Sequence, residues 1–124
     1  MKKTKRERDY IMFLEDILDS AEKIEKYTSG FNIEKLIADE KVQDAVIRRF
    51  EIIGEAVKNL PARFKKEHVD INWKEISGMR DILIHEYFGV NTQRIWKTIE
   101  KDIPDLKNKI SVIIKNSGQQ RLPS

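Results

Sequence analysis

A short stretch of the chain, "GMRDILIHEYFGV" from Gly78 to Val90, gathers side chains that can do chemistry. Five of them fall within eight positions: Arg80, Asp81, His85, Glu86 and Tyr87. An imidazole, whose pKa is ordinarily about 6.5, exchanges protons near neutral pH. A guanidinium offers a planar fork of hydrogen-bond donors that matches phosphate oxygens. These residue types could therefore carry out proton transfer and bind a phosphate group.

The spacing of these residues supports this chemistry only in part. On a helix Asp81 and His85 are four residues apart and share a face, so that the carboxylate can fix the imidazole tautomer. Arg80 and His85 are about 140° apart on an ideal helix and converge only if the arginine reaches round or the helix loosens before Gly89. Spacing alone also allows His85 to be a helix-capping or solvent-exposed residue. It likewise allows Tyr87 to pack its ring against the protein and expose its hydroxyl to solvent.

The rest of the chain predicts an all-α fold, an up-and-down bundle of four to five helices that positions this stretch. The expected elements are a first helix ending near Gly30, a short turn from Ile33 to about Ala38 capped by Asn32, a long central helix from about Glu40 to Leu60, a helix starting at Asp70 or Asn72 and ending at Gly89, and a last helix from Asn91 or Thr92. The last helix keeps one apolar phase, from Ile95 to Ile113, through Pro104, which predicts a kink there.

Size and composition limit the possible functions. A chain of 124 residues fits one domain, residues 1–124, whose ends at 1–6 and 117–124 we expect to fray. The net charge of +3 lies partly in those ends and is a weak indication of a polyanionic partner. No apolar run approaches the roughly 18 residues of a membrane span, so we expect a cytoplasmic protein. Without cysteine, and with two histidines, the chain is not expected to hold a metal or another cofactor.

Two arginines of the long central helix have an unusual place. Counting about 100° per residue from Val42, Arg49 falls in the middle of the apolar stripe and Arg48 at its edge. Arg49 could reach out to water or form a buried pair with a carboxylate. Equally, the stripe could border a cleft in which Arg49 meets a phosphate. The sequence leaves both interpretations open.

The same stretch resembles a known signature. Arg80, a polar Asp81, three further residues, His85, one residue and Tyr87 are similar to the Arg-(polar)-x-x-x-His-x-Tyr motif of the HepT-like branch of the HEPN superfamily. The segments "RRFEIIGEAVKNLP" (48–61) and "INWKEISGMRDILIHEYFGVNTQRIW" (71–96) also resemble this branch, so that the likeness covers roughly the central half of the chain. The signature positions show no departure, since aspartate after the arginine is within the usual range of the family.

The resemblance implies a fold, an activity and a partner. It implies a four-to-five-helix domain that forms a homodimer in which the motifs of two subunits line one cleft. It implies a metal-independent endoribonuclease that acts as the toxin of a toxin–antitoxin pair. The implied antitoxin is a small nucleotidyltransferase of the MntA type, which inhibits the toxin by transferring AMP to the motif tyrosine, here Tyr87.

The chemistry of such an enzyme assigns a role to each motif residue. Metal-free RNA cleavage uses the 2′-hydroxyl as nucleophile and needs a base, an acid and positive charge on the phosphate in the transition state. We assign proton transfer to His85, stabilisation of the phosphate to Arg80 and orientation of His85 to Asp81. Further phosphate contacts are expected from Arg48 and Arg49, with Arg94 and Lys97 as additional candidates. Single-stranded or loop RNA is the expected substrate, because in-line attack needs a flexible backbone.

Two other interpretations remain open. The protein could be a non-catalytic subunit of a nucleotidyltransferase complex that binds nucleotide or substrate, with Arg80 and His85 as phosphate ligands. It could also be a helical interaction subunit in which the motif only caps and packs. The intact pair of Arg80 and His85 favours an enzyme over the second interpretation but barely separates it from the first.

Overall fold

The protein is built from helices. The computed structural model describes the backbone of residues 5–85 and 92–117 and the side chains of residues 10–83 and 92–117. The elements are α1 (Lys5–Tyr27), α2 (Ile33–Ala38), α3 (Glu40–Asn59), α4 (Ala62–Glu67), α5 (Trp73–His85), α6 (Thr92–Lys97), a π-helical turn (Thr98–Asp102) and α7 (Ile103–Asn116). No strand occurs within the described backbone. The predicted all-α class is confirmed.

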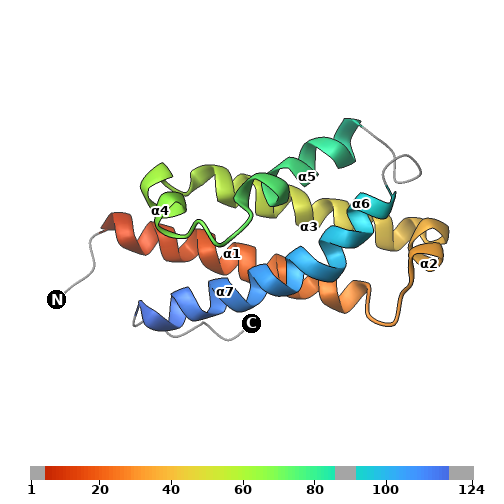
Figure 1. Ribbon diagram of the computed structural model, residues 1–124, viewed down its shortest axis with the longest axis horizontal. Helices are drawn as coiled ribbons and strands as arrows, with labels where there is room; N and C mark the ends of the chain where they lie inside the picture. Colours follow the sequence, from red (N-terminus) through yellow and green to blue (C-terminus); the bar gives the residue numbers. More distant parts are fainter. Residues whose placement is uncertain (1–4, 86–91, 118–124) are drawn as a thin grey trace.

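The four main passes of the chain alternate in direction. Figure 1 shows α1, α3 and α7 along the long axis of the molecule, with α5 crossing α3 at an angle. The short helices α2 and α4 lie at opposite ends of α3. Four long passes with short connecting helices agree with the predicted up-and-down bundle. None of the helices in the described part of the chain is both long and apolar enough to cross a membrane.

Local capping explains where α2, α3 and α5 begin. The Asn32 side chain accepts a hydrogen bond from the Lys35 backbone N–H at 2.8 Å, and Asp39 accepts one from Val42 at 3.1 Å. Gly30, with a φ of +76°, turns the chain between α1 and α2 in a conformation that other residues rarely adopt. The Asn72 side chain accepts from the Glu75 N–H at 3.4 Å, which decides between the two predicted starts of α5.

The long helix α3 is the centre of the bundle, as predicted. It packs against α1 on one side and α5 on the other. Its Phe50 and Ile53 are fully buried, and Arg49 is half-buried. The charged segment after it forms α4, for which no helix was predicted. The Phe64 ring of α4 lies 6.2 Å from Tyr10 and 6.1 Å from Trp73 between ring centroids. One aromatic side chain thus attaches the charged helix α4 to the core.

The C-terminal pass differs in detail from the predicted single kinked helix. It consists of α6, the π-helical turn and α7, and the Ile103 N–H donates to the Thr98 carbonyl five residues earlier. The wider turn comes directly before Pro104, which lacks the N–H that a regular helix would use. The predicted apolar phase holds as far as Ile110, but Ile114 is buried and Ile113 only half-buried. Ile114 is eleven residues after Ile103. In a regular helix of about 100° per residue, the two side chains therefore lie within about 20° of each other around the helix axis, on the same face.

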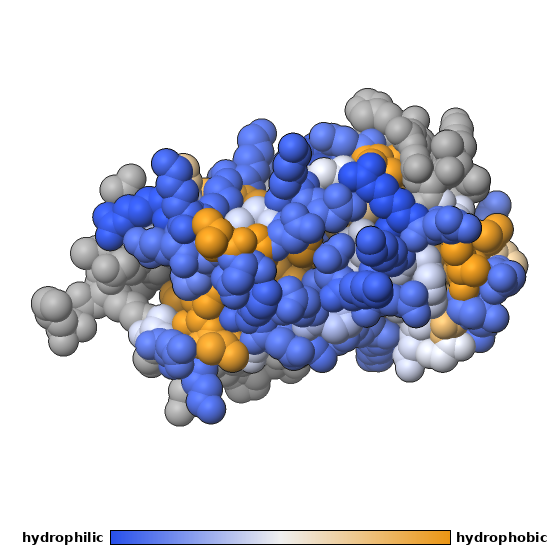
Figure 2. Space-filling model, viewed as in Figure 1, coloured by the Kyte–Doolittle hydropathy of each residue, from blue (hydrophilic) through white to orange (hydrophobic). Residues whose placement is uncertain are grey.

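The face shown in Figure 2 is mostly hydrophilic. Its hydrophobic atoms form separate patches, near α2 at one end and near α4 and α7 at the other. Hydrophilic residues cover most of the surface between these patches.

Candidate functional site

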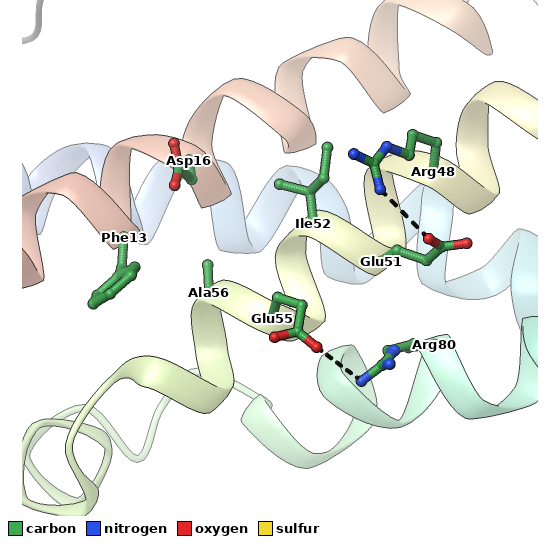
Figure 3. A pocket seen from close by; sticks show the side chains of 8 residues that line it. All are labelled: Phe13, Asp16, Arg48, Glu51, Ile52, Glu55, Ala56 and Arg80. Carbon is green, nitrogen blue, oxygen red and sulfur yellow. Dashed lines mark ion pairs between the residues drawn. The ribbon is translucent and has the colours of Figure 1, made fainter.

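Arg80 lies at the crossing of α5 over α3. Its Nη1 forms an ion pair with Glu55 Oε1 at 3.2 Å (Figure 3), and 37% of its side chain is exposed. The stem of Arg80 rests on Gly54, where an added Cβ would lie 3.3 Å from the arginine Cδ and 3.4 Å from its Cβ. Because Gly54 has no side chain, the arginine can pass close over α3. Two neighbouring residues of α3 therefore fix the place of this guanidinium.

On one side of Arg80 is a pocket of about 420 Å³, here called the acidic hollow. Its walls come from α1, α3 and α5: Phe13, Asp16, Arg48, Glu51, Ile52, Glu55, Ala56 and Arg80. Both arginines in it are paired with carboxylates, Arg48 with Glu51 at 3.6 Å and Arg80 with Glu55. Burial, with a smaller effect of nearby Asp19, raises the pKa of the Asp16 carboxyl. Three carboxylates against two paired arginines make this hollow unfavourable for a phosphate.

On the other side of Arg80 is a pocket of about 390 Å³, here called the lysine hollow. It is lined by residues of α3, α4 and α5: Gly54, Val57, Lys58, Lys65, Lys74, Ser77, Gly78, Arg80 and Asp81. Four of these side chains are cationic and one is a carboxylate. Arg80 thus separates two hollows of opposite charge, and the lysine hollow is the one that favours an anion.

The predicted site residues fall into three groups. Arg80 and Asp81 meet at the lysine hollow, whereas Arg48 lines the acidic hollow. The structure does not test the predicted phosphate contacts of Arg48 and Arg49. His85 is the last residue of α5, and its side chain lies outside the described part of the chain, as does all of Tyr87. The predicted contact of Asp81 with His85 therefore stays a prediction.

Sequence reasoning missed the residues that surround Arg80. Gly54 and Glu55 lie in a helix whose pattern showed only an apolar stripe, and Lys58, Lys65 and Lys74 looked like ordinary solvated charges. A partial signal exists, because Lys74, Gly78 and Asp81 recur at four and three residues and share one face of a helix. The meeting of that face with α3 and α4 depends on how the helices cross, which the local sequence does not encode.

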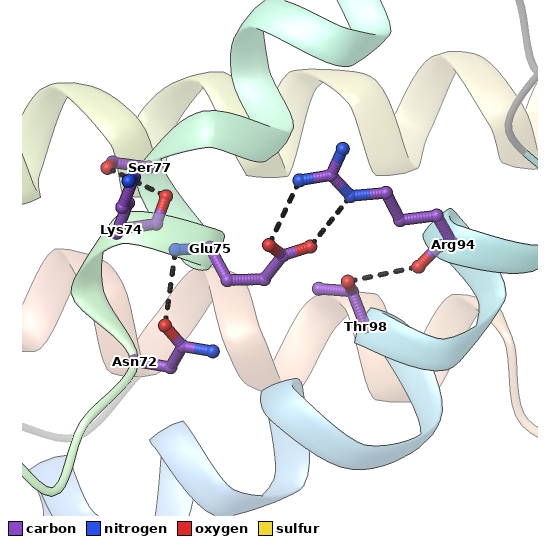
Figure 4. Close-up of polar contacts among 6 residues, drawn as sticks. All are labelled: Asn72, Lys74, Glu75, Ser77, Arg94 and Thr98. Atoms are coloured by element: carbon purple, nitrogen blue, oxygen red, sulfur yellow. Dashed lines mark hydrogen bonds and ion pairs between the residues drawn. The ribbon is translucent and has the colours of Figure 1, made fainter.

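A bidentate ion pair joins the helices on the two sides of residues 86–91. Arg94 of α6 donates from Nε and Nη2 to the two carboxylate oxygens of Glu75 in α5, each at 3.0 Å (Figure 4). The hydrogen bonds from Arg94 lower the pKa of the Glu75 carboxyl. Since Arg94 is engaged with Glu75, it is less available for the phosphate contact considered for it above.

With this geometry described, comparison with known proteins identifies the family. A family model described as ribonuclease HepT-like matches residues 17–113. The match includes the positions of the motif from Arg80 to Tyr87 and every described residue that lines the lysine hollow. The chain belongs to the HepT-like ribonuclease family.

Individual HepT-like proteins agree with this assignment. A "Probable ribonuclease HepT" of Thermococcus cleftensis is 48% identical over 108 residues, which cover 87% of this chain and 98% of that protein. A "Putative RNase TTE0752" of Caldanaerobacter subterraneus subsp. tengcongensis is 48% identical over 103 residues, 83% of this chain and 92% of that protein. No solved structure matches the chain. The predicted resemblance to the HepT-like branch is confirmed.

The contact between Gly54 and Arg80 predicts a change of sign in a double-mutant cycle. Gly54→Ala alone should destabilise the protein, because overpacking against the arginine stem costs about 1–3 kcal/mol. In an Arg80→Ala background the same change should be neutral or stabilising, since alanine is favoured over glycine in a helix by about 1 kcal/mol. Urea unfolding of the four proteins measures the cycle. Equal effects of Gly54→Ala in both backgrounds would contradict the contact.

The Glu75 and Arg94 pair predicts a dependence of stability on pH. Because the pKa of Glu75 is lower in the folded state than in the unfolded chain, its contribution is present above the unfolded pKa and is lost as pH falls through the folded one. Glu75→Gln should lower the free energy of unfolding by about 0.5–1 kcal/mol at pH 7, and by less at pH 3. Glu67→Gln, which affects a more exposed pair with Arg63, is the control. A deficit that stays constant between the two pH values would argue against the assignment.

Proposed function

We propose that this protein is a metal-independent endoribonuclease and the toxin of a toxin–antitoxin pair, with single-stranded or loop RNA as substrate. The observation that carries the proposal is the HepT-like family match over residues 17–113, which contains Arg80, His85 and Tyr87. The names of the relatives refer to ribonucleases and support the same activity. The position of Arg80, half-exposed at the edge of a basic hollow, suits contact with an RNA phosphate.

In the proposed reaction the RNA supplies its own nucleophile. The 2′-oxygen forms a bond to the neighbouring phosphorus as the bond from phosphorus to the 5′-oxygen breaks, which leaves a 2′,3′-cyclic phosphate and a 5′-hydroxyl. A neutral His85 takes the proton of the 2′-hydroxyl, and a protonated His85 gives a proton to the departing 5′-oxygen. Arg80 binds the non-bridging oxygens as their negative charge grows.

Two copies of the chain supply the two protonation states. A single imidazole cannot be base and acid at the same moment, so a homodimer that presents two motifs to one cleft would place one His85 at each oxygen. Asp81, four residues before His85 and exposed, is the proposed orienting carboxylate. Arg49, which lines neither hollow, remains a proposed phosphate contact. Arg48 is the less favourable candidate of the two, because the carboxylates of the acidic hollow that it lines repel a phosphate.

Glu55 does not prevent Arg80 from binding a phosphate. The carboxylate contacts Nη1, and a guanidinium carries five N–H donors in a fixed plane. The remaining donors can receive phosphate oxygens while Glu55 keeps the side chain in place. Glu55 is thus proposed as a positioning residue for Arg80.

Inhibition is proposed to act through Tyr87. A nucleotidyltransferase antitoxin of the MntA type would transfer AMP from a nucleoside triphosphate to the phenol oxygen, with release of pyrophosphate. The added phosphodiester is an anion two residues after His85, and it would repel or exclude a substrate phosphate.

The two histidines of the chain allow a matched test of the nuclease. His85→Ala should lower the rate of RNA cleavage by about 10²- to 10⁴-fold, because general acid–base catalysis is lost, while RNA binding changes little. His68→Ala, which removes the other histidine, should cleave at the wild-type rate. Single-turnover cleavage of a labelled RNA, with the matching DNA as a control without a 2′-hydroxyl, measures both. If the wild-type protein binds this RNA without cutting it, the non-catalytic interpretation is favoured.

The three tyrosines allow a similar test of the inhibition. Incubation with an MntA-type nucleotidyltransferase and ATP should raise the intact mass of the protein by one AMP and abolish RNA cleavage. Tyr87→Phe should stay unmodified and active, whereas Tyr27→Phe should be modified like the wild type. Modification of the Tyr87→Phe variant would place the acceptor elsewhere.

A further inference from the structure

The lysine hollow is more than the surroundings of one arginine. We propose that Lys58, Lys65 and Lys74 bind a backbone phosphate of the RNA next to the one that is cleaved, an inference that rests on the proposed nuclease function. The three lysines come from different elements: the last turn of α3, α4 and the first turn of α5. They line one pocket together with Arg80.

The positive charge of this hollow is only partly neutralised by the protein, by Asp81 in its lining and by the pairing of Arg80 with Glu55. Lys58 and Lys74 form no ion pair with any described residue, and the Lys65 ammonium contacts the backbone carbonyl of Val57 at 3.3 Å. Some lysines elsewhere are paired, such as Lys107, which lies 2.7 Å from Glu25, and Lys23, which lies 3.0 Å from Asp19. Uncompensated cations that converge on one hollow attract an anion more strongly than the same charges spread over a surface.

The shape of the hollow favours a phosphate of a chain over a free nucleotide. No aromatic side chain occurs among its described lining residues, so a nucleobase would find no ring on which to stack. A Cβ added at Gly78 would meet no atom within 4 Å, so this part of α5 is open to an approaching RNA strand. An open, basic surface without a base pocket fits binding to the sugar–phosphate backbone.

The hollow is also continuous with the proposed catalytic residues. Arg80 and Asp81 belong to its lining, and by helical register position 85 follows Asp81 by four residues on the face that carries Lys74 and Gly78. A strand whose cleaved phosphate lies at Arg80 would therefore bring a neighbouring phosphate towards the lysines. The acidic hollow on the other side of Arg80 disfavours the opposite path.

The test removes the charge of the three lysines and keeps their stems. Lys58→Gln, Lys65→Gln and Lys74→Gln are combined, and a control combines Lys26→Gln, Lys101→Gln and Lys115→Gln, exposed lysines outside both hollows with the same change in net charge. Binding of a short single-stranded RNA is measured in the His85→Ala background over a range of salt concentrations. The hollow variant should bind about 10- to 100-fold more weakly near 0.1 M salt, with a salt slope smaller by about 0.7, as expected when one phosphate of a single strand is no longer neutralised.

Each outcome has a definite meaning. Equal weakening in the hollow and control variants, or none in either, overturns the subsite. If the wild-type protein cleaves RNA but the hollow variant binds as tightly, the subsite is wrong and the nuclease stands. If the hollow variant binds weakly but the wild type does not cleave, the nuclease is wrong and only an RNA-binding site remains.

Two further measurements test whether a change in RNA binding comes instead from misfolding of the variant or from loss of binding to a protein partner. The double variant Lys58→Gln and Lys74→Gln leaves the Lys65 contact with Val57 intact and should still weaken binding, so a misfolded triple variant does not decide the question. Normal RNA binding with loss of AMP transfer by the nucleotidyltransferase would instead assign these lysines to the protein partner and overturn the proposal.

Discussion

The crossing of Arg80 over Gly54 is the contact on which the site depends. It brings α5 close to α3. Glu55, the residue after Gly54, binds the Arg80 guanidinium in an ion pair of 3.2 Å. An exposed ion pair contributes little to stability, about 0–1 kcal/mol. Its effect is instead positional, because it keeps a cation at the boundary of two hollows whose charges are opposite. A polyanion that approaches this arginine is favoured on one side and disfavoured on the other.

A second ion pair joins α5 and α6, the two helices on either side of residues 86–91. Glu75 and Arg94 join α5 and α6 by two parallel hydrogen bonds, while the Asn72 side chain caps the start of α5. Planar, bidentate pairing restricts orientation as well as distance. The Glu75–Arg94 pair therefore joins α5 to α6 near neutral pH, where Glu75 is charged. A proposed active site that spans this segment gains a defined frame from one ion pair.

The sequence predicts the features that depend on residues close together in the chain, and it does not predict those that depend on how the helices pack. The cap at Asn32 and the apolar stripe of α3 are local, and the sequence predicts them. The cap at Asp39 is just as local, but it was not among the predicted caps. The burial of Ile114 in place of Ile113 depends on which face of α7 packs against α1, and the lysine hollow depends on where α4 meets α5. Neither is encoded within one element. The roles of His85 and Tyr87 came from family resemblance, because ideal geometry alone leaves Arg80 and His85 about 140° apart.

That angular separation has a consequence for the proposed mechanism. If Arg80 is held on the α3 side of α5, a phosphate bound to it must reach position 85 around the helix or receive the histidine of a second copy. The lysines bear on the same problem, since contacts to a neighbouring phosphate fix the direction of the strand without any contact to the reacting atoms. Binding energy would then come mainly from α3, α4 and the start of α5, and the chemistry from the end of α5. In such a division a short helical chain would need few catalytic residues, because the backbone of the substrate would be positioned elsewhere on the same surface.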